Sequence, residues 1–231
     1  MCGISSWIWQ AKDLTKDLEQ LETSFSNYNV SRESVERLKI YVETLVKWQN
    51  KINLIGLSTK EDIWNRHIID SLQVLEIIQS QNRNLKIIDL GTGAGIPGII
   101  VAIARPTWQI HLVESNSKKV AFLYEVARLT NIKPQIHLAR IENLDIATRV
   151  DFDWVMSRAL APLPELLELS YSITRKAKAL FHKGQDVDVE LTATTKCWNM
   201  EFQRHASLID AQSSILEIIQ VRRRDEFEPE A

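Results

Sequence analysis

Hydrophobic residues recur at helical spacing in the first third of the chain. Between Ser31 and Asn53 they stand three or four positions apart, and serine is a residue type that caps helix N-termini. The apolar positions there are Val35, Leu38, Val42, Leu45, Val46 and Trp48. A second such segment begins near Thr59 and carries Ile63, His67, Leu72, Leu75 and Ile78. The pattern predicts an N-terminal segment of amphipathic helices.

From Lys86 the pattern changes to short apolar runs that alternate with helical stretches. Strands are expected at 86–90, 109–114, 135–138, 153–156 and 179–182, and helices at 95–105 and 117–130. This alternation is typical of an α/β fold with a mostly parallel sheet and helices on both faces. Residues 201–205 and 215–221 suggest a final antiparallel pair, and residues 225–231 a frayed end. We expect two parts, a helical segment over residues 1–84 and a ligand-binding domain over residues 85–231.

Composition narrows the class of protein. With 231 residues, 45% of them hydrophobic and 25% charged, the chain can bury a large core, which excludes disordered, collagen-like and disulfide-scaffold proteins. Neither Cys2 nor Cys197 belongs to a CxxC pair, so we expect no metal site and a reducing, cytoplasmic compartment.

Neither a membrane nor a polycationic surface is expected. The longest apolar run, Ile99 to Ala104, is far shorter than the roughly 20 residues of a spanning helix, and the segment up to Trp9 lacks the basic start of a signal peptide. The net charge is -2, so any contact with nucleic acid must come from local basic patches.

The most informative stretch runs from Asp89 to Gly98, where a predicted strand passes into a predicted helix. Gly93, Gly95 and Gly98 satisfy the G-x-G-x-x-G pattern of dinucleotide-binding proteins. Asp89 followed by Gly91, Gly93 and Gly95 also matches the loop of S-adenosylmethionine (SAM) methyltransferases. A pyrophosphate needs free N–H groups, and Pro97 removes one, whereas the cationic SAM is attracted by a carboxylate. The loop therefore favours SAM over NAD.

Glu114 supports a nucleoside ligand without choosing between the two. It ends the second predicted strand about 20 positions after the glycines, where an acidic residue accepts hydrogen bonds from both hydroxyls of a ribose.

An ordered series of motifs resembles a known family. The series is Lys47-Trp48 with Asn53-Leu54, then Arg66-His67-Ile68-Ile69-Asp70-Ser71, the glycine loop ending in Ile96-Pro97-Gly98, and Ser157-Arg158-Ala159. Between about Tyr41 and Gly184 the chain resembles the bacterial ribosomal RNA small-subunit methyltransferase G family, also called glucose-inhibited division protein B.

The resemblance implies a class I SAM-dependent methyltransferase fold and methyl transfer from SAM to N7 of a guanine in a decoding-centre loop of 16S rRNA. It further implies that the partner is 16S rRNA, the small ribosomal subunit or its assembly intermediate, and that the protein is a monomer. The cofactor contacts it implies, together with those argued from the residues, are Asp89, Gly91, Gly93, Gly95, Ile96, Glu114, Ile141, Glu142 and Arg158.

The chemistry of this reaction asks little of acid–base residues. Guanine N7 is already a nucleophilic lone pair, so we expect no general base, and catalysis by positioning and desolvation. The segment from Ser157 to Pro162 lacks the Asn/Asp-Pro-Pro-Tyr/Phe sequence that exocyclic-amine methyltransferases use, which fits a ring nitrogen target. Arg158 and Lys183 are the positioning candidates.

Candidate RNA contacts come from basic residues. They are Arg66, His67, Lys118, Lys183, Arg222 and Arg223. For Arg66 and His67, which share faces with Asp70 and Ser71 on a predicted helix, a local ion pair between the helical segment and the sheet is an equal alternative. A solvated surface is the alternative for the other basic clusters.

Two other functions remain open on sequence grounds. One is an NAD-linked oxidoreductase, suggested by Gly93, Gly95 and Gly98, and the other is a non-catalytic RNA-binding module that keeps a SAM pocket. Comparing SAM and NAD as ligands separates the first, and SAM binding without methyl transfer identifies the second.

Overall fold

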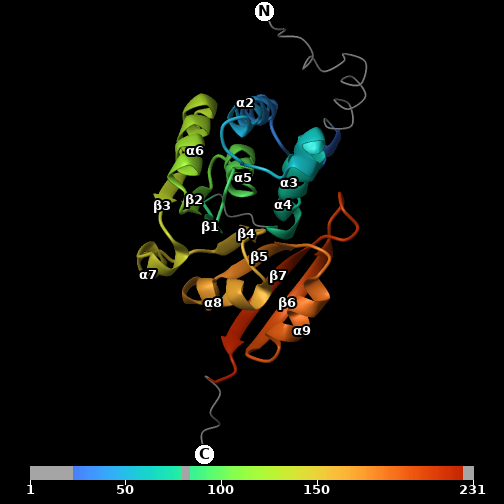
Figure 1. The fold of residues 1–231 in the computed structure, drawn as a ribbon, viewed down its shortest axis with the longest axis vertical. Helices are drawn as coiled ribbons and strands as arrows, with labels where there is room; N and C mark the ends of the chain where they lie inside the picture. The colour runs from blue at the N-terminus through green and yellow to red at the C-terminus, as the bar shows by residue number, and fades with distance from the viewer. Residues whose placement is uncertain (1–22, 80–83, 226–231) are drawn as a thin grey trace, which may run out of the picture.

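A seven-stranded sheet forms the centre of the protein (Figure 1), described here from a computed structural model for residues 23–79 and 84–225. Its strands are β1 (Lys86–Leu90), β2 (Gln109–Glu114), β3 (Gln135–Leu138), β4 (Trp154–Arg158), β5 (Lys178–Lys183), β6 (Trp198–Ala206) and β7 (Ser214–Arg223). The order is β3-β2-β1-β4-β5-β7-β6, with β1 to β5 parallel and β7 antiparallel to both neighbours. The mostly parallel sheet and the final antiparallel pair predicted from the sequence are confirmed.

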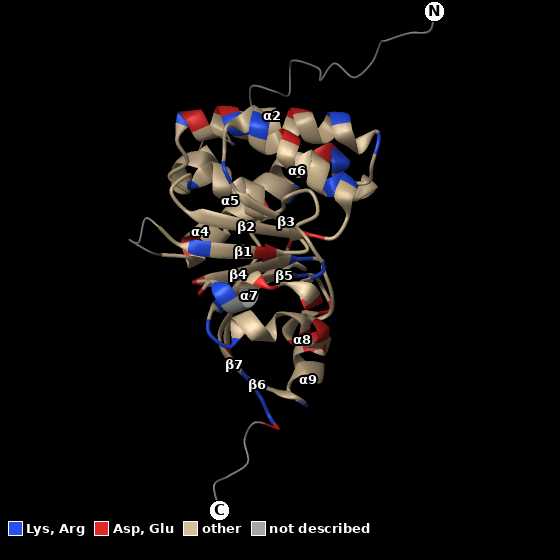
Figure 2. Ribbon diagram, turned by 90° about the vertical axis from the view of Figure 1, so that its left-hand side faces the viewer, with Lys and Arg blue, Asp and Glu red and all other residues tan. Residues whose placement is uncertain are grey.

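Helices cover both faces of this sheet, as the sequence predicts (Figure 2). On one side lie α2 (Arg32–Gln49), α5 (Gly98–Ala104) and α6 (Ser117–Thr130), and on the other α7 (Ile146–Arg149), α8 (Leu163–Thr174) and α9 (Val187–Thr194). Short helical turns complete the chain: η1 (Leu57–Asp62), η2 (Trp64–Ile69), α3 (Asp70–Leu72), α4 (Val74–Ile77) and η3 (Ile141–Asn143).

The second predicted helical segment is not one continuous α-helix. It consists of the 3₁₀ turn η1, the π-helix η2 and the short α3 and α4. The π turn carries the sequence Trp-Asn-Arg-His-Ile-Ile, and turns of this kind are frequent at functional sites. The wider turn changes the direction of Arg66 and His67 relative to an α-helix.

Two further differences concern helix α5 and helix α8. Helix α5 begins at Gly98 rather than Gly95, because Gly95 has φ +82° and cannot belong to a right-handed helix. Helix α8 was not predicted, although Leu163, Leu166 and Leu167 stand at helical spacing and are buried on one face of it.

The helical segment and the sheet share one hydrophobic core. Leu38, Tyr41 and Leu45 of α2 are fully buried and belong to the same cluster as Ile87 of β1 and Ile99 of α5. Val46, counted among the apolar positions of this helix, is instead 37% exposed. The division at residues 84 and 85 stays a prediction about sequence organisation.

Hydrogen bonds reinforce this packing at two buried points. Ser34 Oγ donates to the carbonyl of Ile103 over 2.7 Å, and Tyr41 Oη donates to the carbonyl of Ala94 over 3.0 Å. The second bond connects α2 to the glycine loop between β1 and α5, so the helical segment helps to hold this loop in place.

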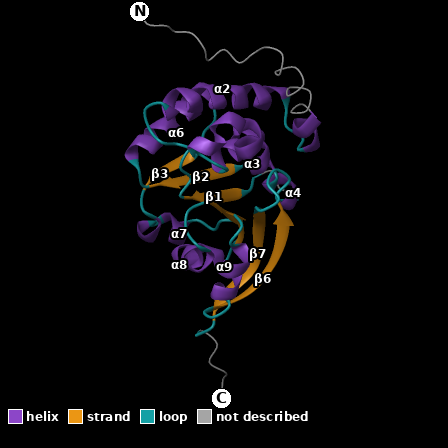
Figure 3. Cartoon of the chain, turned by 45° about the vertical axis from the view of Figure 1, so that its right-hand side comes forward, coloured by secondary structure: helices purple, strands orange, loops and turns teal. Residues whose placement is uncertain are grey.

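The hairpin of β6 and β7 reaches back toward the helical segment (Figure 3). Its turn, residues 207–213, lies beside α3 and α4. There the Leu208 N–H donates to Oε1 of Gln73, the residue between these two helices, over 3.0 Å. Within the described residues, no helix is long and apolar enough to cross a membrane.

Tyr41→Phe tests the tie between α2 and the loop. Removal of the hydroxyl leaves the Ala94 carbonyl without this donor, so we expect the free energy of unfolding to fall by about 1 kcal/mol in urea titrations. Tyr124→Phe is the matched control, because Tyr124 is 57% exposed. Equal stability of the two variants would contradict the assignment.

Candidate functional site

The glycine loop turns the chain at the carboxyl end of β1. Gly91, Gly93 and Gly95 have φ values of +65°, +58° and +82°, a region that favours glycine. A Cβ atom at Gly91 would lie 2.6 Å from Leu160 Cδ1, whereas one at Gly93 would meet nothing closer than 3.9 Å. Gly93 therefore faces open space, which is where a bound molecule can approach the backbone.

Asp89 lies beneath this loop and holds its shape. Its carboxylate is fully buried, and Oδ2 accepts hydrogen bonds from Thr92 Oγ1 and from the Gly98 N–H at 2.9 Å. Burial raises the pKa of Asp89 to about 7, against the two hydrogen bonds, which lower it. The expectation that Asp89 attracts the cation of the cofactor stays a prediction; what the structure shows is a buried side chain bonded to the loop.

Glu114 fastens the loop to the end of β2. Its Oε2 accepts the Gly93 N–H at 3.0 Å and its Oε1 accepts the Asn116 N–H at 2.7 Å. Each carboxylate oxygen has two lone pairs, so both can still accept a hydrogen bond from a ribose hydroxyl. Glu114 is thus placed beside the open face of Gly93, as a nucleoside site requires.

The backbone donors of the loop decide between the two candidate ligands. The N–H groups of Gly95 and Ile96 donate to the Thr92 carbonyl, and those of Gly93 and Gly98 donate to carboxylates. A pyrophosphate needs such donors free at the start of the helix. Because protein oxygens already take them, the loop fits SAM, which carries no phosphate, and does not fit a dinucleotide.

The remaining cofactor candidates are distributed unevenly around the loop. Ile96 is 8% exposed and packs in the core, so little of its side chain can touch a ligand. Ile141 and Glu142 lie in η3, directly after β3. Sequence reasoning did not single out Lys119 as a cofactor contact, although its Nζ would be 4.0 Å from a Cβ at Gly93.

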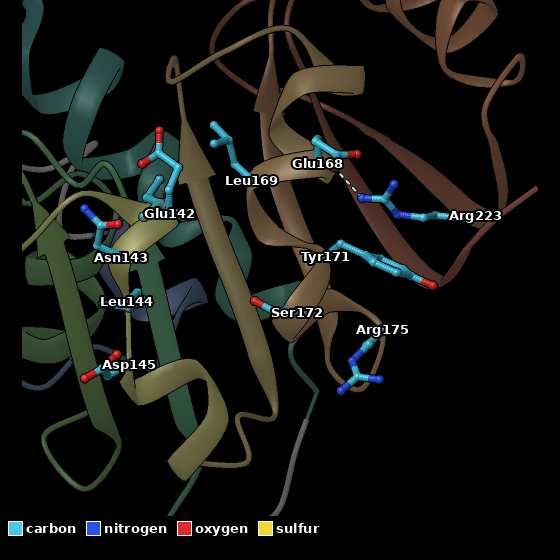
Figure 4. A pocket seen from close by; sticks show the side chains of 11 residues that line it. Glu142, Asn143, Leu144, Asp145, Glu168, Leu169, Tyr171, Ser172, Arg175 and Arg223 are labelled. Carbon is cyan, nitrogen blue, oxygen red and sulfur yellow. Dashed lines mark hydrogen bonds and ion pairs between the residues drawn. The ribbon is translucent and has the colours of Figure 1, made fainter. Parts of the chain in front are cut away.

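A cavity of about 890 Å³ adjoins η3 but lies apart from the glycine loop. It is lined by Ile141 to Asp145, by residues of α8 and by Arg223, and Figure 4 shows Glu168 paired with Arg223 on the α8 side. Since neither the glycines nor Glu114 line this cavity, its size alone does not make it the cofactor site.

Arg158, at the end of β4, is held by the helical segment. Its Nη1 pairs with Oδ2 of Asp70 at 2.9 Å, and its Nη2 donates to the Arg66 carbonyl at 2.8 Å. Asp70 also accepts a hydrogen bond from Ser207 Oγ at 2.9 Å. Asp70 belongs to the quoted Arg-His-x-x-Asp-Ser motif, yet only the fold reveals that it joins three distant segments.

Several candidate RNA contacts are turned inward or paired within the protein. His67 is 6% exposed, its Nε2 lies 2.8 Å from Thr59 Oγ1, and burial lowers its pKa to about 4, so it is neutral at physiological pH. Arg66 pairs with Asp210 at 3.0 Å, which matches the local ion-pair alternative. His67 is thus no cation at physiological pH, while Arg66, whose side chain is 39% exposed, stays a candidate phosphate contact.

The same holds for part of the other basic clusters. Lys183 is 7% exposed and its ammonium pairs with Glu190 at 2.8 Å; its expected role toward the substrate stays a prediction. Arg223 pairs with Glu168 and stacks over the rings of Tyr171 and Trp198. Lys118 and Arg222 are exposed and stay candidate phosphate contacts.

Strand order, the glycine loop and the carboxylate at the end of β2 are together those of the class of SAM-dependent methyltransferases. Within that class the chain belongs to the family of rRNA small subunit methyltransferase G, whose family model matches residues 34–219. Relatives of that name from Rhodospirillum rubrum and Methylobacterium nodulans are 43% and 44% identical. The two alignments cover 84% and 82% of this chain and 94% and 90% of those proteins. The resemblance inferred from the motifs is confirmed.

Solved structures agree with the fold. The chain is similar to the fibrillarin/Nop5p complex, with a TM-score of 0.51 and 11% identity over 66% of this chain and 80% of that one. Ribosomal protein L11 methylase from Lactobacillus delbrueckii subsp. bulgaricus gives the same TM-score at 15% identity, over 67% and 78% of the two chains. The predicted class I methyltransferase fold is confirmed.

Gly93→Val tests the position of the cofactor. The branched side chain would fill the open face of the loop, so we expect SAM affinity measured by calorimetry to fall at least about tenfold. The strain of φ +58° costs roughly 1–2 kcal/mol of stability, which circular dichroism can separate from the binding defect. Gly56→Val is the control, because a Cβ there would meet no atom closer than 3.8 Å. Unchanged SAM affinity in Gly93→Val would place the pocket elsewhere, and tight NAD binding without SAM binding would restore the oxidoreductase alternative.

Asp89→Asn tests the buried carboxylate through pH. The native pKa of about 7 lies above the usual 3.8, so between these values the folded protein binds a proton that the unfolded chain has released. This contribution lowers the free energy of unfolding as pH rises through that window, by at most about 1.4 kcal/mol per pH unit. In urea titrations from pH 4 to 8, we expect Asp89→Asn to lose that dependence. The exposed Asp151→Asn should keep it, and identical pH profiles for all three proteins would refute the assignment.

Proposed function

We propose that this protein transfers a methyl group from SAM to N7 of a guanine in 16S rRNA. Membership of the rRNA small subunit methyltransferase G family is the observation that carries the proposal. The geometry of the loop adds to it, because its backbone donors are taken by carboxylates and carbonyls and its open face suits a nucleoside without phosphate.

The groups around the end of β4 suit a reaction that needs no base. Ser157 Oγ donates to the Leu90 carbonyl at 2.9 Å, and Arg158 is tied to Asp70, so neither is a proton acceptor. The nearby His182 has a pKa lowered to about 4 by burial and is a weak base. Guanine N7 attacks with a free lone pair and loses no proton, so this set of side chains is sufficient.

In the proposed step, the bond from the methyl carbon to N7 forms as the bond from that carbon to sulfur breaks. The positive charge passes from the sulfonium to the guanine ring, and no proton moves. The protein contributes by holding both partners in line and excluding water. Gly91, Gly93 and Glu114 hold the cofactor side, and the Asp70–Arg158 pair fixes the edge from which the base approaches.

For the RNA itself, we propose that exposed cations around the site contact phosphates, with Lys118 and Arg222 as the most exposed candidates from the sequence and Arg66 beside them. We further propose that the protein acts in the cytoplasm as a monomer on 16S rRNA, on the small subunit or on its assembly intermediate. A guanine inside folded RNA has to leave its stack to reach the methyl group.

Mass mapping of 16S rRNA from a strain that lacks the gene tests the proposal. We expect one N7-methylguanine to disappear and to return when the gene is restored, but not when the Gly93→Val gene is supplied. Labelled SAM with purified rRNA, assembly intermediates and small subunits then identifies the species that accepts the methyl group. Persistence of the N7-methylguanine in the deletion strain would disprove the assignment.

A further inference from the structure

A second cavity lies at the carboxyl ends of β4 and β5. Its volume of about 310 Å³ is at the lower end of the ~300–1,000 Å³ range of small-molecule sites. It is lined by Asp70 of α3, residues 158–162 at and after the end of β4, residues 182–184 at the end of β5, Glu190 of α9 and the ends of the β6–β7 hairpin. Segments distant in sequence, from α3, the sheet and the hairpin, therefore enclose it.

One side chain separates this cavity from the glycine loop. Leu160 lines the cavity, and its Cδ1 would be 2.6 Å from a Cβ at Gly91. The preceding residue, Ala159, has φ +52°. This conformation is energetically unfavourable for any residue other than glycine, and such residues are frequent at functional sites. The cavity is thus the immediate neighbour of the cofactor loop, across a segment held in a strained conformation.

The interior is polar and its charges are balanced. Lys183 pairs with Glu190, and Arg158 pairs with Asp70, so each carboxylate faces a buried or half-buried cation. Ser214 Oγ, in a residue only 3% exposed, has no hydrogen-bond partner among the described residues. A buried hydroxyl without a partner is costly, and a polar ligand in the cavity would satisfy it.

Glu190 keeps one carboxylate oxygen available. Its Oε2 accepts the Leu163 N–H at 2.6 Å and pairs with Lys183, while both interactions leave Oε1 unused. The side chain of Glu190 is 21% exposed, and Lys183 is itself fixed by donating to the Ala161 carbonyl at 2.7 Å. Glu190 is therefore an immobilised acceptor at the wall of a cavity next to the cofactor.

We propose that this cavity receives the target guanine and that Oε1 of Glu190 accepts hydrogen bonds from its N1–H and N2 amino group. The inference rests on the proposed function and specifies how the base is held. Among the four bases of RNA, only guanine presents two adjacent donors of this kind on its Watson–Crick edge, so a carboxylate selects it. A base flipped out of RNA is read on that same edge.

Glu190 also contributes to the rate in this arrangement. As N7 gains the methyl group, the ring becomes positively charged and its N1–H and amino group become stronger donors. Their hydrogen bonds to a carboxylate strengthen at the same moment, so the interaction is worth more in the transition state than in the ground state.

Inosine substitution tests the inference with the unaltered protein. Inosine keeps N7, O6 and N1–H but lacks the amino group, and it is placed in 16S rRNA at the position that mass mapping identifies. With labelled SAM, we expect kcat/KM for the inosine substrate to be at least about tenfold lower than for guanosine, since a bond to a charged acceptor is lost. Equal rates would overturn the inference and leave the proposed function intact, whereas no transfer to guanosine would refute the proposed function itself.

Glu190→Gln assigns the discrimination to this residue. We expect kcat to fall at least about tenfold and the guanosine-to-inosine ratio to shrink below about 3, because the charged acceptor is gone. The ratio compares two substrates on one protein, so partial unfolding does not change it. Asp188→Asn, on the same helix but paired with Arg204 at the surface, should keep the normal ratio. A normal ratio in Glu190→Gln would overturn the role of Glu190.

Gly184→Trp tests the place of the base independently. Gly184 is exposed at the cavity, and a Cβ there would meet no atom within 4 Å, so a large side chain can occupy the space without disturbing the fold. We expect methyl transfer to fall at least about tenfold while SAM affinity by calorimetry stays unchanged. Gly56→Trp serves as the control for a bulky exposed residue. Full activity of Gly184→Trp would overturn the assignment of the cavity.

Discussion

The site depends on a fully buried carboxylate beneath the glycine loop. Asp89 closes the glycine loop by accepting the Gly98 N–H and the Thr92 hydroxyl, and this places the open face of Gly93 next to Glu114. The interaction is costly, because a fully buried carboxylate has a raised pKa. It also consumes the donor at the start of α5 that a phosphate would need. The same contact therefore shapes the loop and disfavours dinucleotides. The hydrogen bonds of the loop thus help to determine which class of ligand it binds.

A second carboxylate performs a comparable task for the other half of the site. Asp70 pairs with Arg158 at the end of β4 and accepts a hydrogen bond from Ser207 in the turn of the β6–β7 hairpin. Through these contacts the helical segment, the parallel sheet and the antiparallel hairpin meet at one edge. The parallel sheet thus determines where the site lies, and the helical segment and the β6–β7 hairpin enclose it.

Local patterns predicted the elements whose structure is decided locally. The ranges of β1, β2, β3 and α6 agree with the sequence prediction, because alternation, apolar runs and the Asn116 cap specify them. The glycine loop and Glu114 were found from their spacing alone. The burial of Lys183 could not be predicted, because its partner Glu190 carries no sequence signal that points to this pair, whereas His67 already stands among the apolar positions of its segment. The π turn of η2 likewise depends on packing rather than on residue preference.

The position of β7 in the sheet has a consequence for how the enzyme is made. Among the described strands it is the last in the sequence, yet it inserts between β5 and β6 and contributes Ser214 to the cavity. During synthesis, the glycine loop and Glu114 leave the ribosome well before this strand. Where the cavity receives the base as proposed, its wall is therefore completed only after the hairpin has been translated, later than the parts proposed to hold the cofactor.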